Sequence, residues 1–197
     1  MLEAMQREVE EVRANLLRIF PKDKKCDWKK NGAWPAKETG PLLFRPASAA
    51  QMKAIEAHMA LSLTPTMKAF LSVTNGWKHF WLDFTLFGSG APLLTMLDRL
   101  ALQTAADQAS IAGVDFDDAT AVKRWRKLDA ENLYLGHCHV LGADGAGSFL
   151  VVDKTAKRKK GELEIGYWTL DGGLWSDRRF PDMLALMAWA REQSAAY

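Results

Sequence analysis

The sequence predicts an α+β domain in which helices flank an antiparallel sheet. Up to about residue 130, most apolar residues recur at spacings of three and four, the period of a helix with one buried side. One aromatic run, Phe80–Phe87, alternates instead and predicts a strand. After residue 132 alternation becomes general and glycine-containing turns separate the runs, which is typical of a β-meander. Helices gathered around an antiparallel sheet define the α+β class.

Residues 1–47 are predicted as an N-terminal extension. Residues 1–19 form an amphipathic helix that ends at Pro21, and its charged face, Glu8 included, is expected to be solvated. The apolar stripe of this helix consists of Met5, Val9, Val12, Leu16 and Ile19. Residues 21–47 are irregular. If they lie across the domain, three aromatic side chains hold them there, because these are costly to leave in water: Trp28, Trp34 and Phe44. The extension could instead reach a partner or join two copies into a homodimer.

The domain proper, residues 48–197, begins with two capped helices. Ser48 caps the first, and Thr64 caps the second, with Pro65 at a first position where a missing N–H costs nothing. Asn75-Gly76 ends the second helix with residues that tolerate a left-handed backbone. The buried stripes consist of Met52, Ile55, Met59 and Leu63, then Met67, Phe70, Leu71 and Val73.

Two more helices are predicted before the meander, over residues 93–109 and 120–128. Their core candidates are Leu94, Leu97, Leu100 and Leu102, then Val122, Trp125 and Leu128. The meander strands are expected over residues 132–142, 147–154 and 161–170. Gly172-Gly173 then turns the chain into a closing helix, Phe180–Gln193.

The composition is that of a globular protein in a reducing compartment. Apolar residues make up 48% of the 197 residues, enough for a sizeable core. Two cysteines, Cys26 and Cys138, do not make a disulfide framework. The acidic N-terminus is unlike a signal peptide, and no stretch approaches the ~20 apolar residues that span a bilayer. We therefore expect a cytoplasmic location and no membrane partner.

A set of ordered motifs resembles the SUKH superfamily. Ile55-Glu56 is followed by LSLTPTMKAFLSVTNGW (61–77), which is similar to the family's leucine-proline lead, its helix ending in "FL…NG" and its aromatic strand. Gly147–Asp153, GSFLVVD, resembles the family's "G…FLxxD" strand. Phe180–Leu184 resembles its C-terminal aromatic residue and short helix. The resemblance covers residues 48–193 and leaves the extension outside.

This resemblance implies a function as well as a fold. Bacterial SUKH proteins are largely immunity proteins that bind and neutralise polymorphic toxins, many of them nucleases or deaminases. A cognate protein toxin is therefore the expected partner, whose active site would be occluded or distorted. The alternative is a regulatory adaptor of the same fold that has no toxin. The signature residues themselves, such as Pro65, Phe70 and Gly76, are expected to be structural.

Catalysis, a cofactor and a metal are not predicted. His137-Cys138-His139 is the one metal-like cluster, in which residues 137 and 139 share a face if the run is a strand. A structural zinc site needs about four ligands, and no second pair completes one. Cys138 lies on the opposite face from both histidines, so neither serves it as a base. No phosphate-binding loop motif is present. We therefore expect a protein that is not an enzyme.

The net charge of +2 is too small to indicate nucleic acid as a direct partner, so charge complementarity must be local. Asp115, Phe116, Asp117 and Asp118 form a loop that could fill a cationic toxin site, or else simply cap the following helix. Exposed aromatic anchors are sought near Trp77, Lys78 and His79, and at Trp175. The cationic loop Lys154–Lys160 is interpreted as a solvated hairpin tip, with a partner contact as the alternative.

Overall fold

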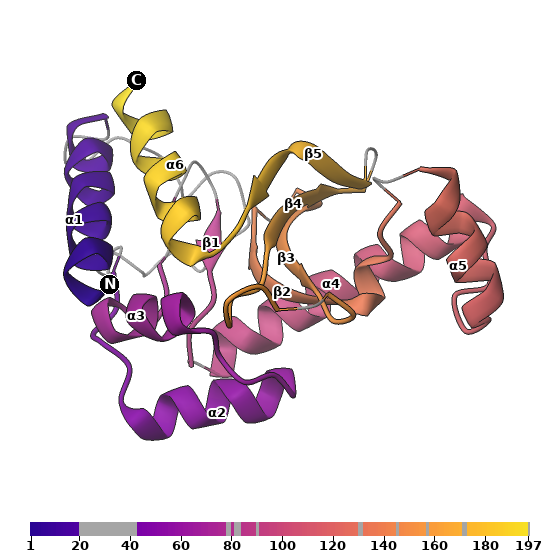
Figure 1. Ribbon diagram of the computed structural model, residues 1–197, viewed down its shortest axis with the longest axis horizontal. Helices are drawn as coiled ribbons and strands as arrows, with labels where there is room; N and C mark the ends of the chain where they lie inside the picture. Colours follow the sequence, from indigo (N-terminus) through magenta and orange to yellow (C-terminus); the bar gives the residue numbers. More distant parts are fainter. Residues whose placement is uncertain are drawn as a thin grey trace.

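The computed structural model describes residues 1–19, 43–77, 80, 84–89, 91–129, 132–144, 146–156, 158–170 and 173–196. It confirms the α+β fold. Within these residues six α-helices surround one antiparallel sheet, whose five strands follow one another in chain order (Figure 1). None of the helices described in these ranges is long and apolar enough to span a bilayer.

The N-terminal helix α1 (Leu2–Ile19) lies beside the last helix, α6 (Met183–Ala195), and contacts α3 (Pro65–Val73) (Figure 1). Its predicted stripe is confirmed for Met5, Val9, Val12 and Leu16, all buried. These side chains belong to the same core as the meander, so α1 contributes to the domain itself. The side chain of Ile19, and the whole of residues 20–42 with Trp28 and Trp34, lie outside the described residues. Phe44 is 38% exposed, and its backbone N–H donates to Oγ1 of Thr74 over 3.1 Å.

Glu8 contradicts the expectation of a solvated charged face on α1. Its side chain is 6% exposed, its Oε2 lies 3.4 Å from Nε of Arg191 on α6, and its Oε1 accepts from Nη1 of Arg191 over 3.5 Å. Next to it, Nδ2 of Asn15 donates to Oγ of Ser194 over 3.2 Å. The sequence pattern of α1 alone does not reveal that α6 covers this part of its polar face.

The two capped helices form as predicted. In α2 (Ala49–Met59), Oγ of Ser48 accepts from the Gln51 N–H and the Gln51 side chain accepts from the Ser48 N–H, which completes a capping box. In α3, Oγ1 of Thr64 accepts from the Met67 N–H. The predicted stripes are confirmed as buried at Ile55, Met59, Leu63, Met67, Phe70 and Leu71, and half-buried at Met52 and Val73.

The turn after α3 is locked to the turn after the first strand. The Ser89 N–H donates to Oδ1 of Asn75 over 2.7 Å, and Nδ2 of Asn75 donates to Oγ of Ser89 over 2.6 Å. Gly88 lies against the Asn75 carbonyl, and a Cβ at this glycine would stand 2.3 Å from that oxygen. Gly76 has the left-handed backbone that the sequence predicts, with a φ of 99°, but α3 itself ends earlier, at an extended Thr74.

The first strand is shorter than predicted. Within the described part of the Phe80–Phe87 run, only β1 (Thr85–Leu86) forms, and Leu86 also makes an isolated bridge to Trp77. The meander follows as β2 (Cys138–Ala143), β3 (Ser148–Asp153), β4 (Ile165–Thr169) and β5 (Gly173–Phe180). The sequence missed β5 because its middle is polar. As the outer strand of the described sheet, β5 tolerates charged side chains that an inner strand would not.

The run NLYL (132–135) is not a strand, contrary to the prediction. It leads into a short 3₁₀ turn, η1 (Leu135–His137), and side chains satisfy its backbone. The Leu133 carbonyl accepts from Nε2 of Gln108 over 3.0 Å and from Nε1 of Trp168 over 2.7 Å. The Leu135 N–H donates to Oε1 of Gln108 over 2.9 Å. These side-chain bonds replace the ladder that a neighbouring strand would supply.

The long helix α4 (Ala91–Ala112) contacts β2 and η1, and α5 (Ala119–Leu128) lies at the far end of the molecule from α1 (Figure 1). Leu102 and Leu128 were predicted as core, and both predictions are wrong, since they are 72% and 78% exposed. Leu100 is half-buried and Val122 buried, whereas the side chains of Leu94 and Leu97 lie outside the described residues. Helical spacing alone does not show which side of a projecting helix is covered.

The described side chains of the cationic loop after β3 are exposed, as predicted, but its base is fastened to the domain. Arg158 donates to the Ser62 carbonyl. Glu162 accepts from the Thr66 N–H over 3.0 Å and from the Thr66 hydroxyl over 2.8 Å. The hairpin is therefore held at the N-terminal end of α3, with Lys159 and Lys160 pointing to solvent.

Candidate functional site

The three predicted acidic residues of the α4–α5 connection are exposed, but two of them are used locally. Oδ1 of Asp115 accepts from the Asp117 N–H over 3.0 Å, which closes a turn. Oδ1 of Asp118 accepts from the Thr120 N–H over 2.8 Å, so Asp118 is the N-cap of α5. The capping alternative is thereby confirmed for Asp118. A partner contact by this loop stays a prediction.

Phe116 is not the exposed aromatic that the acidic-loop hypothesis needs. It is 9% exposed and stacks on Tyr134, with ring centroids 3.8 Å apart and planes 6° from parallel. Trp125 meets the Phe116 ring edge-on at 5.0 Å. Phe116 therefore anchors the α4–α5 connection on the domain.

The predicted anchors around Trp77 also change. Trp77 is fully buried and packs edge-on against Phe80 at 5.3 Å, so its side chain is not available to a partner. Its backbone also forms isolated bridges to Leu43 and Leu86, which hold it in the core. Lys78 and His79 lie outside the described residues.

Trp175, on β5, is exposed as expected, at 37%. The Arg178 guanidinium lies 4.7 Å from the centroid of the Trp175 ring and 4.9 Å from that of Tyr167. The Trp175 Nε1 donates to Oγ1 of Thr169 over 3.1 Å. This aromatic and arginine cluster has the composition of an interface anchor, and its contact with a partner remains a prediction.

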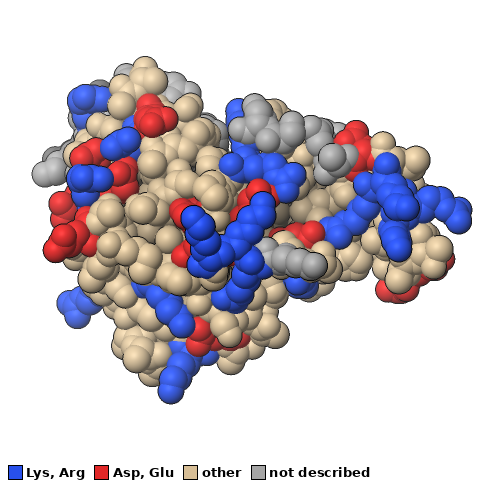
Figure 2. All heavy atoms as spheres, viewed as in Figure 1, with Lys and Arg blue, Asp and Glu red and all other residues tan. Residues whose placement is uncertain are grey.

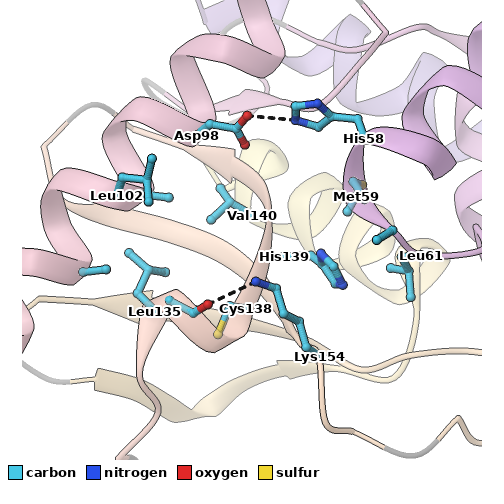
Figure 3. A pocket seen from close by; sticks show the side chains of 14 residues that line it. His58, Met59, Leu61, Asp98, Leu102, Leu135, Cys138, His139, Val140 and Lys154 are labelled. Carbon is cyan, nitrogen blue, oxygen red and sulfur yellow. Dashed lines mark hydrogen bonds and ion pairs between the residues drawn. The ribbon is translucent and has the colours of Figure 1, made fainter. Parts of the chain in front are cut away.

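The structure adds a site that sequence reasoning missed, a groove between α2, α4 and the start of β2 with a volume of about 640 Å³ (Figure 3). Its apolar lining consists of Met59, Leu61, Leu102, Leu135 and Val140, among others. We call it the α2–α4 groove. The exposed Leu102 side chain lies along one wall of this groove. No sequence signal predicts the groove, since its lining comes from four separate stretches of the chain.

Polar groups border the α2–α4 groove at both ends. At one end Nε2 of His58 lies 2.9 Å from Oδ2 of Asp98, which ties α2 to α4 (Figure 3). At the other, Nζ of Lys154 donates to the Gly136 carbonyl over 3.1 Å, and His139 lies beside it. The arrangement suits an inserted apolar side chain whose flanking polar atoms meet this rim.

The pKa values of Cys138 and His139, two of the residues that line the groove, favour their neutral forms at neutral pH. Burial, and then the charge of Asp153, raises the pKa of the Cys138 thiol to about 12. Its Sγ donates to the Tyr134 carbonyl over 3.5 Å. Burial, and then the charge of Lys154, lowers the pKa of His139 to about 4. Neither group is therefore prepared as a nucleophile or an acid at pH 7.

The predicted sharing of one face by His137 and His139 is wrong. His137 ends the 3₁₀ turn and lines a second pocket beside α5, whereas His139 lies in the α2–α4 groove. The two imidazoles therefore face different cavities. Within the described ranges no group of three or more metal-type ligands lies together.

Neither models of known protein families nor curated proteins match this sequence. The resemblance to the SUKH superfamily therefore stays a hypothesis.

We predict that Cys138 is inert toward alkylation in the folded protein. A thiol with a pKa of about 12 holds almost no thiolate at pH 8, and only 7% of the residue is exposed. Iodoacetamide at pH 8 should leave Cys138 unmodified in the native protein and modify it in urea. Mass spectrometry of the peptide that contains Cys138 separates it from Cys26. Rapid modification of the native protein at Cys138 would contradict the prediction.

Proposed function

We propose that this protein is a non-catalytic binding protein of the immunity type, which neutralises a cognate bacterial toxin by holding it. The observation that carries the binding part is the α2–α4 groove, with Leu102 exposed at 72% on its wall. An apolar hollow bordered by a few polar groups is the usual setting of a binding site, and the exposed Leu102 extends its apolar surface. The toxin part rests on the ordered motifs of the sequence and on their resemblance to SUKH immunity proteins.

The described contacts of the motif residues are consistent with a structural role for them. Phe70 and Leu71 are fully buried, and the Asn75 side chain is hydrogen-bonded to Ser89. The groove uses other residues. Among similar immunity proteins this separation would let one fold hold different toxins, because surface residues can change while the buried motif stays.

The groove is suited to supply the centre of a tight interface. An immunity protein needs nanomolar binding or better, which corresponds to about −12 kcal/mol. Such an interface covers roughly 800 Å² on each partner, and a few central side chains contribute most of the binding free energy. An apolar side chain of the toxin in the groove would be one of these. The neutral states of Cys138 and His139 support a holding role over a catalytic one.

The experiment compares two substitutions on one helix. Leu102 lines the groove and Ile111 does not, yet both are 72% exposed on α4. The protein is co-expressed with the product of the adjacent gene, and growth and co-purification are scored. Leu102→Lys should abolish rescue and weaken binding by about 2 kcal/mol or more, roughly 30-fold. Ile111→Lys should do neither, because Ile111 lies outside the groove and a surface substitution of this kind changes stability by less than about 0.5 kcal/mol.

Three outcomes decide against parts of the proposal. A neighbour that is harmless alone but still co-purifies would favour the regulatory adaptor. Equal rescue by Leu102→Lys and the wild type would remove the groove as the binding site. Turnover of a substrate by the purified protein would contradict the non-catalytic role.

A further inference from the structure

A second pocket, beside α5, has a different chemistry from the α2–α4 groove. It has a volume of about 540 Å³ and is lined by Lys123, Arg126 and Lys127 of α5, together with His137 and Thr155. Lys and Arg side chains gather over α5 at the far end of the molecule, as Figure 2 shows. The two cavities share no lining residue. We call this second cavity the α5 pocket.

The wall of the α5 pocket is fixed by one of its cations. Nη2 of Arg126 lies 2.7 Å from Oδ2 of Asp153, and its Nη1 donates to Oγ1 of Thr155 over 3.3 Å. This pair holds α5 against the end of β3. Lys123 and Lys127 are exposed on the same helix, one turn apart, so both ammonium groups can reach one ligand.

His137 lies in the α5 pocket within reach of the charges of Arg126 and Lys154. Burial, then the charges of Arg126 and Lys154, lowers the pKa of its imidazole, against the opposite influence of Asp153. An anion placed in the pocket would reverse the effect of these cations and favour the imidazolium form.

We propose that the α5 pocket binds an acidic segment of a protein partner, with carboxylates facing Lys123, Lys127 and His137. An apolar residue of the same segment would cover Leu128, which follows Lys127 and is 78% exposed. Asp117 also lines the pocket, and Asp115 and Asp118 flank it. A nucleic acid carries a negative charge on every nucleotide and would bring phosphates against these aspartates, whereas a protein segment can alternate its charges. The proposal does not depend on the toxin or on the groove.

The test uses a fluorescent peptide in which glutamates alternate with leucines, and two variants that lose the same charge. Lys123→Gln with Lys127→Gln removes two cations from the α5 pocket. Arg13→Gln with Arg124→Gln removes two exposed cations outside it, one of them also on α5. The pocket variant should bind the peptide about tenfold more weakly, because it loses the binding free energy of two modest ion pairs. The control variant should bind like the wild type.

Two further probes complete the test. A peptide with glutamine in place of glutamate should not bind, and a single-stranded DNA of the same net charge should bind more weakly than the acidic peptide. In NMR, the acidic peptide should raise the pKa of His137 in the wild type and less in the pocket variant. Equal losses in both variants, tighter binding of the DNA, or no binding of the acidic peptide would each overturn the proposal. Circular dichroism checks that both variants remain folded.

Discussion

Replacing Gly88 with alanine should lower the free energy of unfolding by about 3 kcal/mol, because the new Cβ has no room. It would stand 2.3 Å from the Asn75 carbonyl oxygen and 2.8 Å from the Asn75 carbonyl carbon. Both are backbone atoms, and the Asn75 side chain is held by Ser89. Relief of the clash therefore has to separate the turn after α3 from the turn after β1. Urea denaturation should show the loss, and the melting temperature should fall by about 6–12 °C.

Gly113→Ala is the matched control. Gly113 has a φ of 61°, and a Cβ there would meet nothing within 4 Å. Alanine at this position bears only the left-handed backbone penalty, about 1 kcal/mol. A smaller destabilisation for Gly88→Ala than for Gly113→Ala would show that the two turns separate easily, contrary to the lock described between them.

Replacing Arg191 with leucine should destabilise the protein by about 2 kcal/mol, because it leaves the buried Glu8 carboxylate without its main cation. Removing one partner of a fully buried pair has a larger effect, about 3–5 kcal/mol. Arg191 is 32% exposed, so water screens part of this interaction and the expected loss is smaller. The measurement is the free energy of unfolding in urea at neutral pH.

The double variant separates charge from packing. Glu8→Leu added to Arg191→Leu should recover most of the lost stability, since two apolar side chains then face each other between α1 and α6. Arg7→Leu is the control, because Arg7 also touches Glu8, at 3.5 Å, but is 65% exposed. It should change stability by less than about 1 kcal/mol. Additive losses in the double variant would mean that the Glu8–Arg191 contact contributes little.

Local signals predicted the helices well because their causes are local. The Ser48 and Thr64 caps, Pro65 at the start of α3 and the Asn75-Gly76 turn each act within a few residues of themselves. The buried stripe of α1 follows from spacing alone. The strands β3 and β4 also form where alternation predicts them, although both are shorter than predicted.

The wrong predictions of burial and of secondary structure occur where contacts with distant segments determine the structure. Glu8 is buried because α6, at the other end of the chain, covers it. The run at Leu133 is irregular because Gln108 and Trp168 satisfy its backbone from two other elements. Leu102 and Leu128 have the spacing of core residues, but no other described segment covers these two side chains, and both are largely exposed. A single sequence does not show which distant segments will be in contact.

The candidate site was the least predictable part. Trp77 and Phe116 are residue types that often anchor interfaces, but both side chains are packed inside this fold. The groove depends on His58, Leu102 and Lys154, which lie in three segments and share no motif. Trp175 was recognised because it follows a turn, where side chains often stand at a surface.

The polar joint at Leu133 has a consequence for how the groove would bind. One carbonyl there holds both Gln108 and Trp168, and Gln108 in turn holds the Leu135 N–H at the groove wall. Leu135 is therefore fixed before any ligand arrives, and little conformational entropy remains to be lost on binding. A preorganised receptor of this kind binds as a rigid body, with an association rate set by encounter and orientation instead of by a slow rearrangement. Loosening the joint, although it touches no ligand, would act chiefly on affinity.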